Sequence, residues 1–192
     1  MLLNLLKEIK MNINVYTEST PNPATMKFIV NKLLINGSVD YATKASAEVS
    51  PFAKELFKFS FVNGVFFASN FVTVTKTEGA DWDDVEPIVK EFVKGAVESE
   101  LKVQIEEQLE VDFEGTDSEK KIQQILQDYV RPAVEQDGGA ITYKSFNEGV
   151  VTVELRGSCS GCPSSTITLK AGIENLLKRM VPEVTEVVSE AL

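Results

Sequence analysis

Short runs in which apolar and polar residues alternate dominate the first hundred residues, and a period of two is typical of strands. Turn-forming residues separate these runs. The pattern predicts strands at residues 13–16, 25–30, 33–35, 65–67 and 71–75. Because only Ala68, Ser69 and Asn70 separate the last two runs, we expect these two to form a hairpin.

Two helices are predicted in the same region. Ser50 and Pro51 favour the N-cap and the first turn, so we expect a short helix that continues to Phe57. Asp81 is placed to cap a longer helix. The apolar residues of this second helix follow the i, i+3, i+4 spacing of one buried face: Val85, Ile88, Val89, Phe92, Val93 and Ala96.

A helix with a wide apolar stripe is predicted after residue 116. Thr116 and Glu119 have the spacing of a capping box. The stripe consists of Ile122, Ile125, Leu126, Tyr129, Val130, Ala133 and Val134. Pro132 should kink this helix, because proline lacks the backbone donor and clashes with the preceding turn. Gly138 and Gly139 suit a left-handed stop at its C-terminus.

A hairpin, a helix and a strand complete the sequence. The two hairpin strands are predicted at 141–146 and 150–156, and the helix runs from about Pro163 to Met180. The last strand is predicted at 184–188. We therefore expect an α+β protein with a C-terminal α-β-β-α-β unit, in which helices cover a three-stranded sheet, and an N-terminal α+β unit with antiparallel strands.

An acidic stretch lies between the two units. Residues 98–117 contain eight acidic side chains and a single lysine, Lys102. Like-charged segments are usually solvated connectors, although the apolar residues here tend to alternate and allow part of the stretch to pair as a strand. We expect an N-terminal domain at 1–97, with an extension at 1–10, an acidic linker at 98–115, and a C-terminal domain at 116–192.

Composition excludes several functions. The net charge of −10 argues against binding nucleic acid, which requires clustered lysine and arginine. No apolar run approaches the ~18 residues of a membrane span, so we expect no membrane partner. Residues 1–10 lack arginine and a small-residue cleavage site, which predicts a cytoplasmic location. The absence of histidine removes the commonest general base and mixed Cys/His zinc fingers.

The candidate chemistry lies in the loop between the second hairpin strand and the last helix. The only two cysteines, Cys159 and Cys162, are three positions apart there. Gly161 allows a turn with positive φ, so that both sulfurs can face the same way. Pro163 suits the first helical position and places Cys162 near the N-cap, where the helix dipole stabilises thiolates and lowers their pKa. The local sequence predicts a site for negatively charged sulfur.

The spacing alone leaves four interpretations open: a buried or disulfide-bonded pair, a thioredoxin-like redox motif, a zinc site and an iron–sulfur site. Glycine and serine surround the pair, which is unlike a core, and residues 163–192 are too few to complete a thioredoxin-like fold. Zinc and iron–sulfur sites each require about four thiolates. Because this chain supplies two, a second copy related by a two-fold axis would complete the set, at an interface that can open to release a cluster.

The cysteine loop and its surroundings resemble the C-terminal domain of NifU, as it occurs in Nfu-type iron–sulfur proteins. The resemblance begins at Asp137-Gly138-Gly139, continues to Gly-Ser-Cys-Ser-Gly-Cys-Pro-Ser-Ser at 157–165, and covers nearly all of 116–192. The first part of the chain is similar to the companion domain of that family. The similar segments are Thr20-Pro21-Asn22-Pro23, Lys27-Phe28, Ser50-Pro51 and the hairpin that begins at Gly64.

The resemblance implies a scaffold or carrier, not an enzyme, that receives a 4Fe-4S cluster and delivers it to apo-proteins. By position, the cluster ligands correspond to Cys159 and Cys162, and the same thiolates can hold a 2Fe-2S form. The implied partners are a second copy of the chain in a cluster-bridged homodimer, an upstream cluster scaffold and apo client proteins. The alternatives are a dithiol oxidoreductase with Cys159 as its nucleophile, and a zinc-stabilised interaction module.

Three other groups of residues each have two interpretations. The turn at 21–23 either rigidifies a loop or docks a partner. Arg156 and Lys170 either offset the charge of a thiolate-bound cluster or are solvated. A group of phenylalanines forms either the core of a small domain or an apolar surface for clients: Phe57, Phe59, Phe61, Phe66, Phe67 and Phe71.

Overall fold

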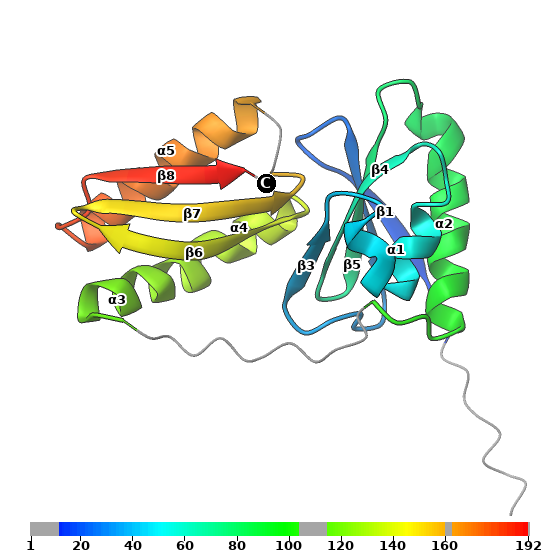
Figure 1. Ribbon diagram of the computed structural model, residues 1–192, viewed down its shortest axis with the longest axis horizontal. Helices are drawn as coiled ribbons and strands as arrows, with labels where there is room; N and C mark the ends of the chain where they lie inside the picture. The colour runs from blue at the N-terminus through cyan, green and yellow to red at the C-terminus, as the bar shows by residue number, and fades with distance from the viewer. Residues whose placement is uncertain (1–11, 104–114, 160–162, 192) are drawn as a thin grey trace, which may run out of the picture.

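The computed structural model describes residues 12–103, 115–159 and 163–191. Residues 12–103 form the N-terminal module, and the described residues from 115 onward form the C-terminal module. Each module has its own sheet, and the two lie side by side (Figure 1). The predicted α+β class is confirmed.

The N-terminal sheet contains five antiparallel strands in the spatial order β1-β2-β5-β4-β3. These strands are β1 (Val15–Ser19), β2 (Thr25–Val30), β3 (Ser38–Tyr41), β4 (Val62–Ala68) and β5 (Phe71–Lys76). The strand predicted at 25–30 and the β4–β5 hairpin are confirmed, while β1 lies two to three residues further along than expected.

The strand predicted at 33–35 is wrong. The amides of Leu34 and Ile35 both donate to the carbonyl of Ser69, at 2.8 and 3.1 Å, so this apolar run folds over the β4–β5 turn instead of pairing along a ladder. The strand at this edge of the sheet is β3, which pairs with β4 from Ser38 opposite Ala68 to Tyr41 opposite Val65. Tertiary contact therefore overrode local strand propensity.

Helices cover one face of the N-terminal sheet, on the side away from the C-terminal module (Figure 1). They are η1 (Ser46–Val49), α1 (Pro51–Leu56) and α2 (Trp82–Glu98). The predicted caps are confirmed: the Ser50 hydroxyl accepts from the Ala53 amide, and the Asp81 carboxylate accepts from the Asp83 amide. Ile88, which was expected to be buried, is 45% exposed because it lies at the edge of the α2 stripe.

The C-terminal module has the predicted α-β-β-α-β order. Its elements are α3 (Asp117–Ile125), η2 (Leu126–Val130), α4 (Arg131–Gln136), β6 (Gly139–Asn147), β7 (Val150–Gly157), α5 (Pro163–Met180) and β8 (Glu186–Ala191). The central strand β7 pairs antiparallel with β6 and parallel with β8. Val151, Val153 and Leu155 of β7 join residues of both helical segments in one core.

The long helix of this module changes its winding where proline was expected to disturb it. The Thr116–Glu119 capping box forms as predicted, and a π-helical turn, η2, ends two residues before Pro132. The wider turn shifts the helical register, so part of the predicted stripe leaves the core. Tyr129 is 61% exposed and Ala133 is also exposed, which corrects the prediction that both are buried.

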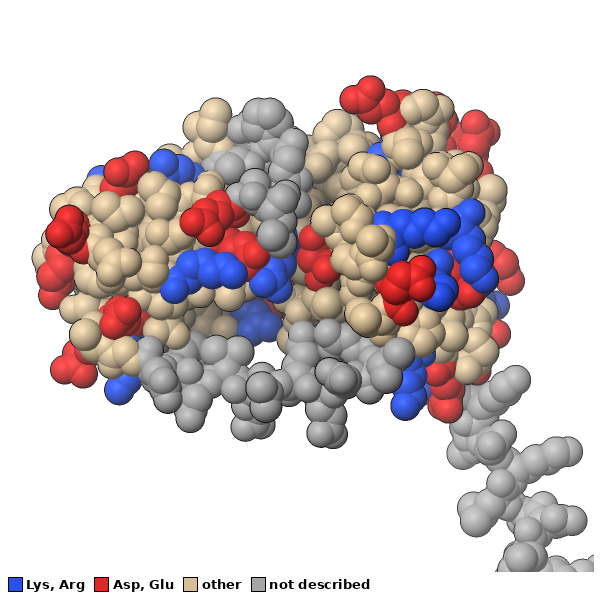
Figure 2. All heavy atoms as spheres, viewed as in Figure 1, with Lys and Arg blue, Asp and Glu red and all other residues tan. Residues whose placement is uncertain are grey.

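The surface carries mixed charge. On the face shown in Figure 2, the described acidic and basic side chains are interspersed over both modules and form no broad basic patch. Within the described ranges, no helix is long and apolar enough to cross a membrane.

Candidate functional site

Cys159 lies two residues after the end of β7, where the strand register places Gly157 opposite Gly139. Its side chain belongs to the C-terminal core and is only 4% exposed, which corrects the expectation that the surroundings of this cysteine are unlike a core. Pro163 is the first residue of α5, as predicted. The second candidate ligand, Cys162, and the Gly161 turn lie outside the described residues.

Glycine at the start of β6 makes room for the Cys159 sulfur. A Cβ at Gly139 would lie 2.7 Å from Cys159 Sγ and 2.7 Å from the carbonyl oxygen of Arg156, so any larger residue would displace one of them. Gly138 has φ of 80°, the left-handed conformation that was expected at the end of the helix. The two glycines therefore fix where the chain turns beneath the cysteine.

Ser158 joins the two backbone segments on either side of the sulfur. Its hydroxyl donates to the carbonyl of Asp137, and its amide donates to the carbonyl of Gly138 at 3.3 Å. The same hydroxyl lies 3.9 Å from Cys159 Sγ. Because these bonds tie the α4–β6 turn to the end of β7, the position of Cys159 depends on both segments.

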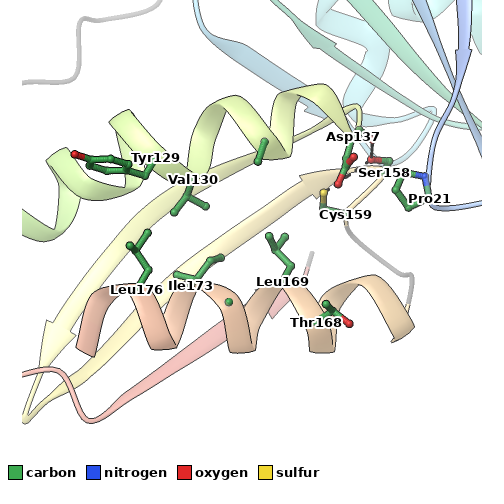
Figure 3. A pocket seen from close by; sticks show the side chains of 12 residues that line it. Pro21, Tyr129, Val130, Asp137, Ser158, Cys159, Thr168, Leu169, Ile173 and Leu176 are labelled. Carbon is green, nitrogen blue, oxygen red and sulfur yellow. Dashed lines mark hydrogen bonds between the residues drawn. The ribbon is translucent and has the colours of Figure 1, made fainter. Parts of the chain in front are cut away.

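An open groove of about 660 Å³ begins at Cys159 and extends between the α3–α4 helix and α5 (Figure 3). Cys159, Asp137 and Pro21 lie at one end, and Leu176 and Tyr129 lie at the other. The exposed part of the predicted helix stripe, including Ala133, therefore lines a groove beside the candidate ligand.

The basic residues proposed to balance a bound cluster have carboxylate partners in this structure. Arg156 Nη2 lies 2.7 Å from Glu154 and Lys144 Nζ lies 2.8 Å from the same carboxylate. Burial opposes ionisation of Glu154, but hydrogen bonds from these two cations outweigh it, and the pKa of Glu154 is lowered. Lys170 Nζ lies 3.7 Å from Glu186.

The Pro-Asn-Pro turn forms a local turn and also touches the C-terminal module. The side-chain oxygen of Asn22 accepts from the Ala24 amide at 3.0 Å, as expected for turn chemistry. Its side-chain nitrogen donates to the carbonyl of Ser158 at 3.4 Å. Pro21 lines the groove beside Cys159, so this turn reaches the candidate site from the other module.

The chain provides few ligands for a metal centre. Within the described ranges there is no group of three or more histidine, cysteine, aspartate or glutamate side chains that could hold an ion. The sequence contains two cysteines and no histidine. A site built on Cys159 and Cys162 therefore needs additional ligands from another molecule to reach the four that zinc or an iron–sulfur cluster usually takes.

Sequence reasoning missed the contribution of one face of the N-terminal sheet. Lys27 and Thr73, on β2 and β5, contact the backbone of the turn that leads to Gly139 beneath Cys159, at Glu135, Gln136 and Gly138. The unbroken apolar run Val65-Phe66-Phe67-Ala68 was a usable signal, because a strand that is apolar at successive positions is buried on both faces.

Models of two protein families match this chain in the same order as the two modules. Residues 15–100 match "Scaffold protein Nfu/NifU N terminal", and residues 122–188 match "NifU-like domain". The chain therefore belongs to the Nfu/NifU scaffold family, as the resemblance at the cysteine loop indicated.

Among its relatives are two proteins with the same name, "NFU1 iron-sulfur cluster scaffold homolog, mitochondrial". The protein from Drosophila willistoni is 37% identical over 184 residues, which are 93% of this chain and 64% of the relative. The human protein is 39% identical over 175 residues, which are 88% of this chain and 69% of the relative. This chain thus spans slightly less than two thirds of the Drosophila willistoni protein.

A solution structure of a NifU-like protein from Saccharomyces cerevisiae is also similar. The match covers 50% of this chain and 87% of the yeast chain, with 18% identity and a TM-score of 0.44.

The names of the relatives contradict the predicted cytoplasmic location, because both are named mitochondrial proteins. The prediction was drawn from composition and from the residues at 1–10. The composition of the folded modules does not indicate the cellular compartment, because targeting depends on dedicated signal segments.

Proposed function

We propose that the protein binds an iron–sulfur cluster through Cys159 and Cys162 and transfers it to apo-proteins. The observation that carries this proposal is the pair of cysteines at the β7–α5 junction, in a chain whose relatives are named iron–sulfur cluster scaffold homologs. Thiolates are the usual ligands of such clusters. The cluster is the cargo of the protein, and the protein acts as a carrier and not as a catalyst.

The number of ligands supports a shared site. Two cysteines provide half of the four thiolates that a cluster requires, and the chain contains no histidine to replace the others. A second copy would add the same two sulfurs across a two-fold axis. We therefore propose a homodimer bridged by a 4Fe-4S cluster, with an upstream scaffold as donor and apo iron–sulfur proteins as acceptors.

The division of the chain forms part of the proposal. We assign cluster binding to residues 116–192 and a supporting or partner-binding role to residues 1–97, joined by the acidic segment at 98–115. The two separate hydrophobic cores support this division.

Anaerobic reconstitution with iron and sulfide tests the proposal. A carrier of this kind should bind about four irons and four sulfides per dimer, with the absorbance of a cluster. Cys159→Ser and Cys162→Ser should each lose the cluster and the cluster-dependent dimer. Ser160→Ala is the matched control, because it changes the same loop without removing sulfur.

Two results would replace this function with an alternative. A colourless protein that binds zinc in place of iron and sulfide would indicate a zinc-stabilised interaction module. A protein that retains no cluster but catalyses disulfide reduction would indicate a dithiol oxidoreductase.

A further inference from the structure

One face of the N-terminal sheet is covered by the C-terminal module instead of by helices. We call it the docking face and define it by Lys27, Phe66, Phe71 and Thr73. The neighbours of these residues along the strands point to the opposite face and belong to the core under α1 and α2. They include Phe28, Val65, Val72 and Val74. Because side chains alternate along a strand, the same strands present a second face on the other side.

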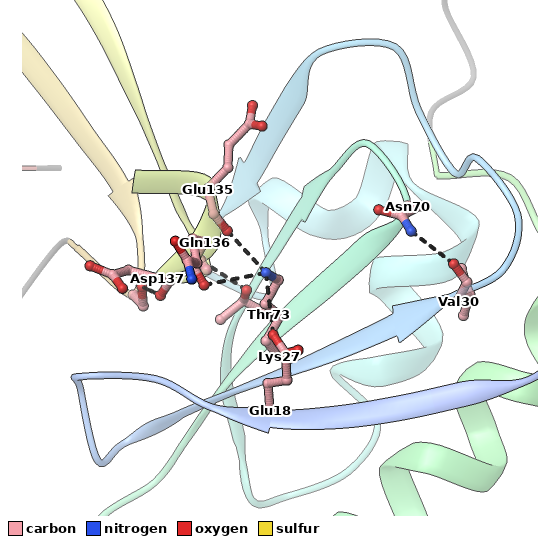
Figure 4. A network of polar contacts seen from close by, with 10 residues as sticks. Glu18, Lys27, Val30, Asn70, Thr73, Glu135, Gln136 and Asp137 are labelled. Atoms are coloured by element: carbon pink, nitrogen blue, oxygen red, sulfur yellow. Dashed lines mark hydrogen bonds and ion pairs between the residues drawn. The ribbon is translucent and has the colours of Figure 1, made fainter. Parts of the chain in front are cut away.

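Lys27 makes two hydrogen bonds from the docking face to the C-terminal module. Its ammonium donates to the carbonyls of Glu135 and Gln136, at 3.1 and 3.3 Å, at the C-terminal end of α4 (Figure 4). A cation is favourable there because the last carbonyls of a helix carry the negative end of its dipole. The residue is only 7% exposed, and its ammonium also lies 4.5 Å from the centre of the Phe71 ring.

Further contacts hold the backbone on both sides of the cysteine. The buried Thr73 hydroxyl donates to the carbonyl of Gly138 at 2.8 Å. Phe66 packs so closely on Gly157 that a Cβ there would lie 2.9 Å from its ring. Together with the hydrogen bond from Asn22 to Ser158, these contacts hold the two backbone segments that position Cys159, the α4–β6 turn and the end of β7.

The apolar part of this contact is small. Phe66 and Phe71 form a separate buried cluster with Ala68 and with Ala140 of the C-terminal module. The phenylalanines considered together in the sequence therefore have two different positions. Phe66 and Phe71 lie between the modules, whereas Phe57 and Phe67 are buried in the N-terminal core. An interface that combines a small apolar cluster with hydrogen bonds to backbone carbonyls resembles contacts that separate readily, since water can replace those hydrogen bonds.

We propose that the docking face holds the turns beside Cys159 in a closed form in which the sulfur is buried, and that release of this contact lets these turns move and exposes the sulfur for ligation. In this structure Cys159 is 4% exposed, and Pro21 of the N-terminal module lies at the same end of the groove as Cys159. A sulfur that shares a cluster with a second chain has to be reachable from outside. Docking and ligation therefore oppose each other, and partners that separate the modules promote loading.

The contacts that hold the turns beside Cys159 are seen in the structure, whereas their role in loading rests on the proposed function. The two can be tested separately, because the reactivity of a thiol toward an alkylating reagent does not depend on iron or sulfide.

The test measures alkylation of Cys159 by iodoacetamide in the full-length Cys162→Ser protein, where it is the only thiol. If opening is rapid, the rate reports the open fraction. Lys27→Met keeps the packing of the side-chain stem but removes the ammonium donor from the carbonyls of Gln136 and Glu135, of which Glu135 keeps the Gly138 amide as a donor. We expect about a tenfold faster reaction, equivalent to about 1.4 kcal/mol. Lys27→Met also removes the salt bridge to Glu18, but the Glu18 side chain is 55% exposed and stays solvated without its partner.

Lys32→Met is the matched control, because this lysine forms an ion pair with the exposed Glu100, which follows α2 on the other side of the sheet from the docking face. It should leave the rate unchanged. Equal rates for the Lys27 and Lys32 variants would overturn the proposal, and so would a parent protein that reacts as fast as its urea-unfolded chain.

Thr73→Val provides an independent variant if circular dichroism shows that Lys27→Met is unfolded. It removes only the hydroxyl that bonds Gly138 and should also accelerate alkylation, while unchanged reactivity would contradict the proposal. Small-angle scattering should show a larger radius of gyration for the opened variant than for the parent. Failure of cluster reconstitution with normal shielding would reject the proposed function alone.

Discussion

Gly139→Ala is the sharpest test of how the fold positions Cys159. The added Cβ would lie 2.7 Å from both the carbonyl oxygen of Arg156 and the sulfur of Cys159, and 3.1 Å from the cysteine Cβ. Ordinary contacts between such atoms are about 3.5 Å or more, so a backbone group and the sulfur both have to move. Overpacking of this kind costs about 1–3 kcal/mol.

Part of this cost is offset in the unfolded chain. Alanine has fewer accessible backbone conformations than glycine, which favours the folded state by about 0.5–1 kcal/mol. The net expectation is a free energy of unfolding lower by about 1–2 kcal/mol. Because the sulfur is one of the two displaced atoms, cluster content after reconstitution should fall as well.

Urea unfolding and the iron-to-protein ratio measure the two effects. Gly95→Ala is the control, because nothing lies within 4 Å of its Cβ and it is inside α2, where alanine should stabilise by about 0.5–1 kcal/mol. The reasoning is refuted if Gly139→Ala matches Gly95→Ala in stability and the parent protein in cluster content.

Three further predictions concern stability. Ser50→Ala removes a fully buried N-cap and should lower the free energy of unfolding by about 1–2 kcal/mol in urea unfolding; an unchanged midpoint would contradict the capping argument. Leu177→Ala should cost about 2–5 kcal/mol in the same assay, because this side chain is completely buried, whereas Leu33→Ala, at a 59% exposed position, should change stability by less than about 0.5 kcal/mol. Burial raises the pKa of Asp40 from 3.8 to about 6, against the attraction of Arg156 and with the repulsion of Glu154. The folded state binds the proton of the Asp40 carboxyl more tightly than the unfolded state, so the stability that this gives is present below pH 3.8 and is lost as pH rises through about 6. At pH 7.5, Asp40→Asn should therefore raise the free energy of unfolding by about 2 kcal/mol, after allowance for partial exposure. A lower free energy of unfolding would show that the attraction of Arg156 dominates.

Much of the fold could be predicted from local signals. The caps at Ser50, Asp81 and Thr116 each involve residues within three positions of one another, and all three form as predicted. The left-handed turn at Gly138 is similarly local. These features depend on short-range hydrogen bonds and backbone sterics, which a few consecutive residues determine.

The two errors have different causes, a long-range contact in one case and a local change of helix winding in the other. The run at 33–35 has strand-forming residues, but the carbonyl of Ser69 satisfies its amides. The stripe through Tyr129 and Ala133 follows an α-helical period, but the π-helical turn before Pro132 changes the period. Neither the pairing partner nor the local winding can be read from periodicity alone.

The sequence by itself limited the candidate sulfur ligands to Cys159 and Cys162 and excluded histidine, because composition fixes how many such ligands one chain can supply. A site with four thiolates would therefore require a second molecule. The sequence also determined the family, since the cysteine loop and the turns around it are contiguous in the chain. Only the tertiary structure decided that Cys159 is shielded and that Lys27 caps a helix 108 positions away. The physical reason is that burial depends on which surfaces pack together in the folded chain. Those contacts form between residues that are far apart in the sequence, so no local pattern predicts them.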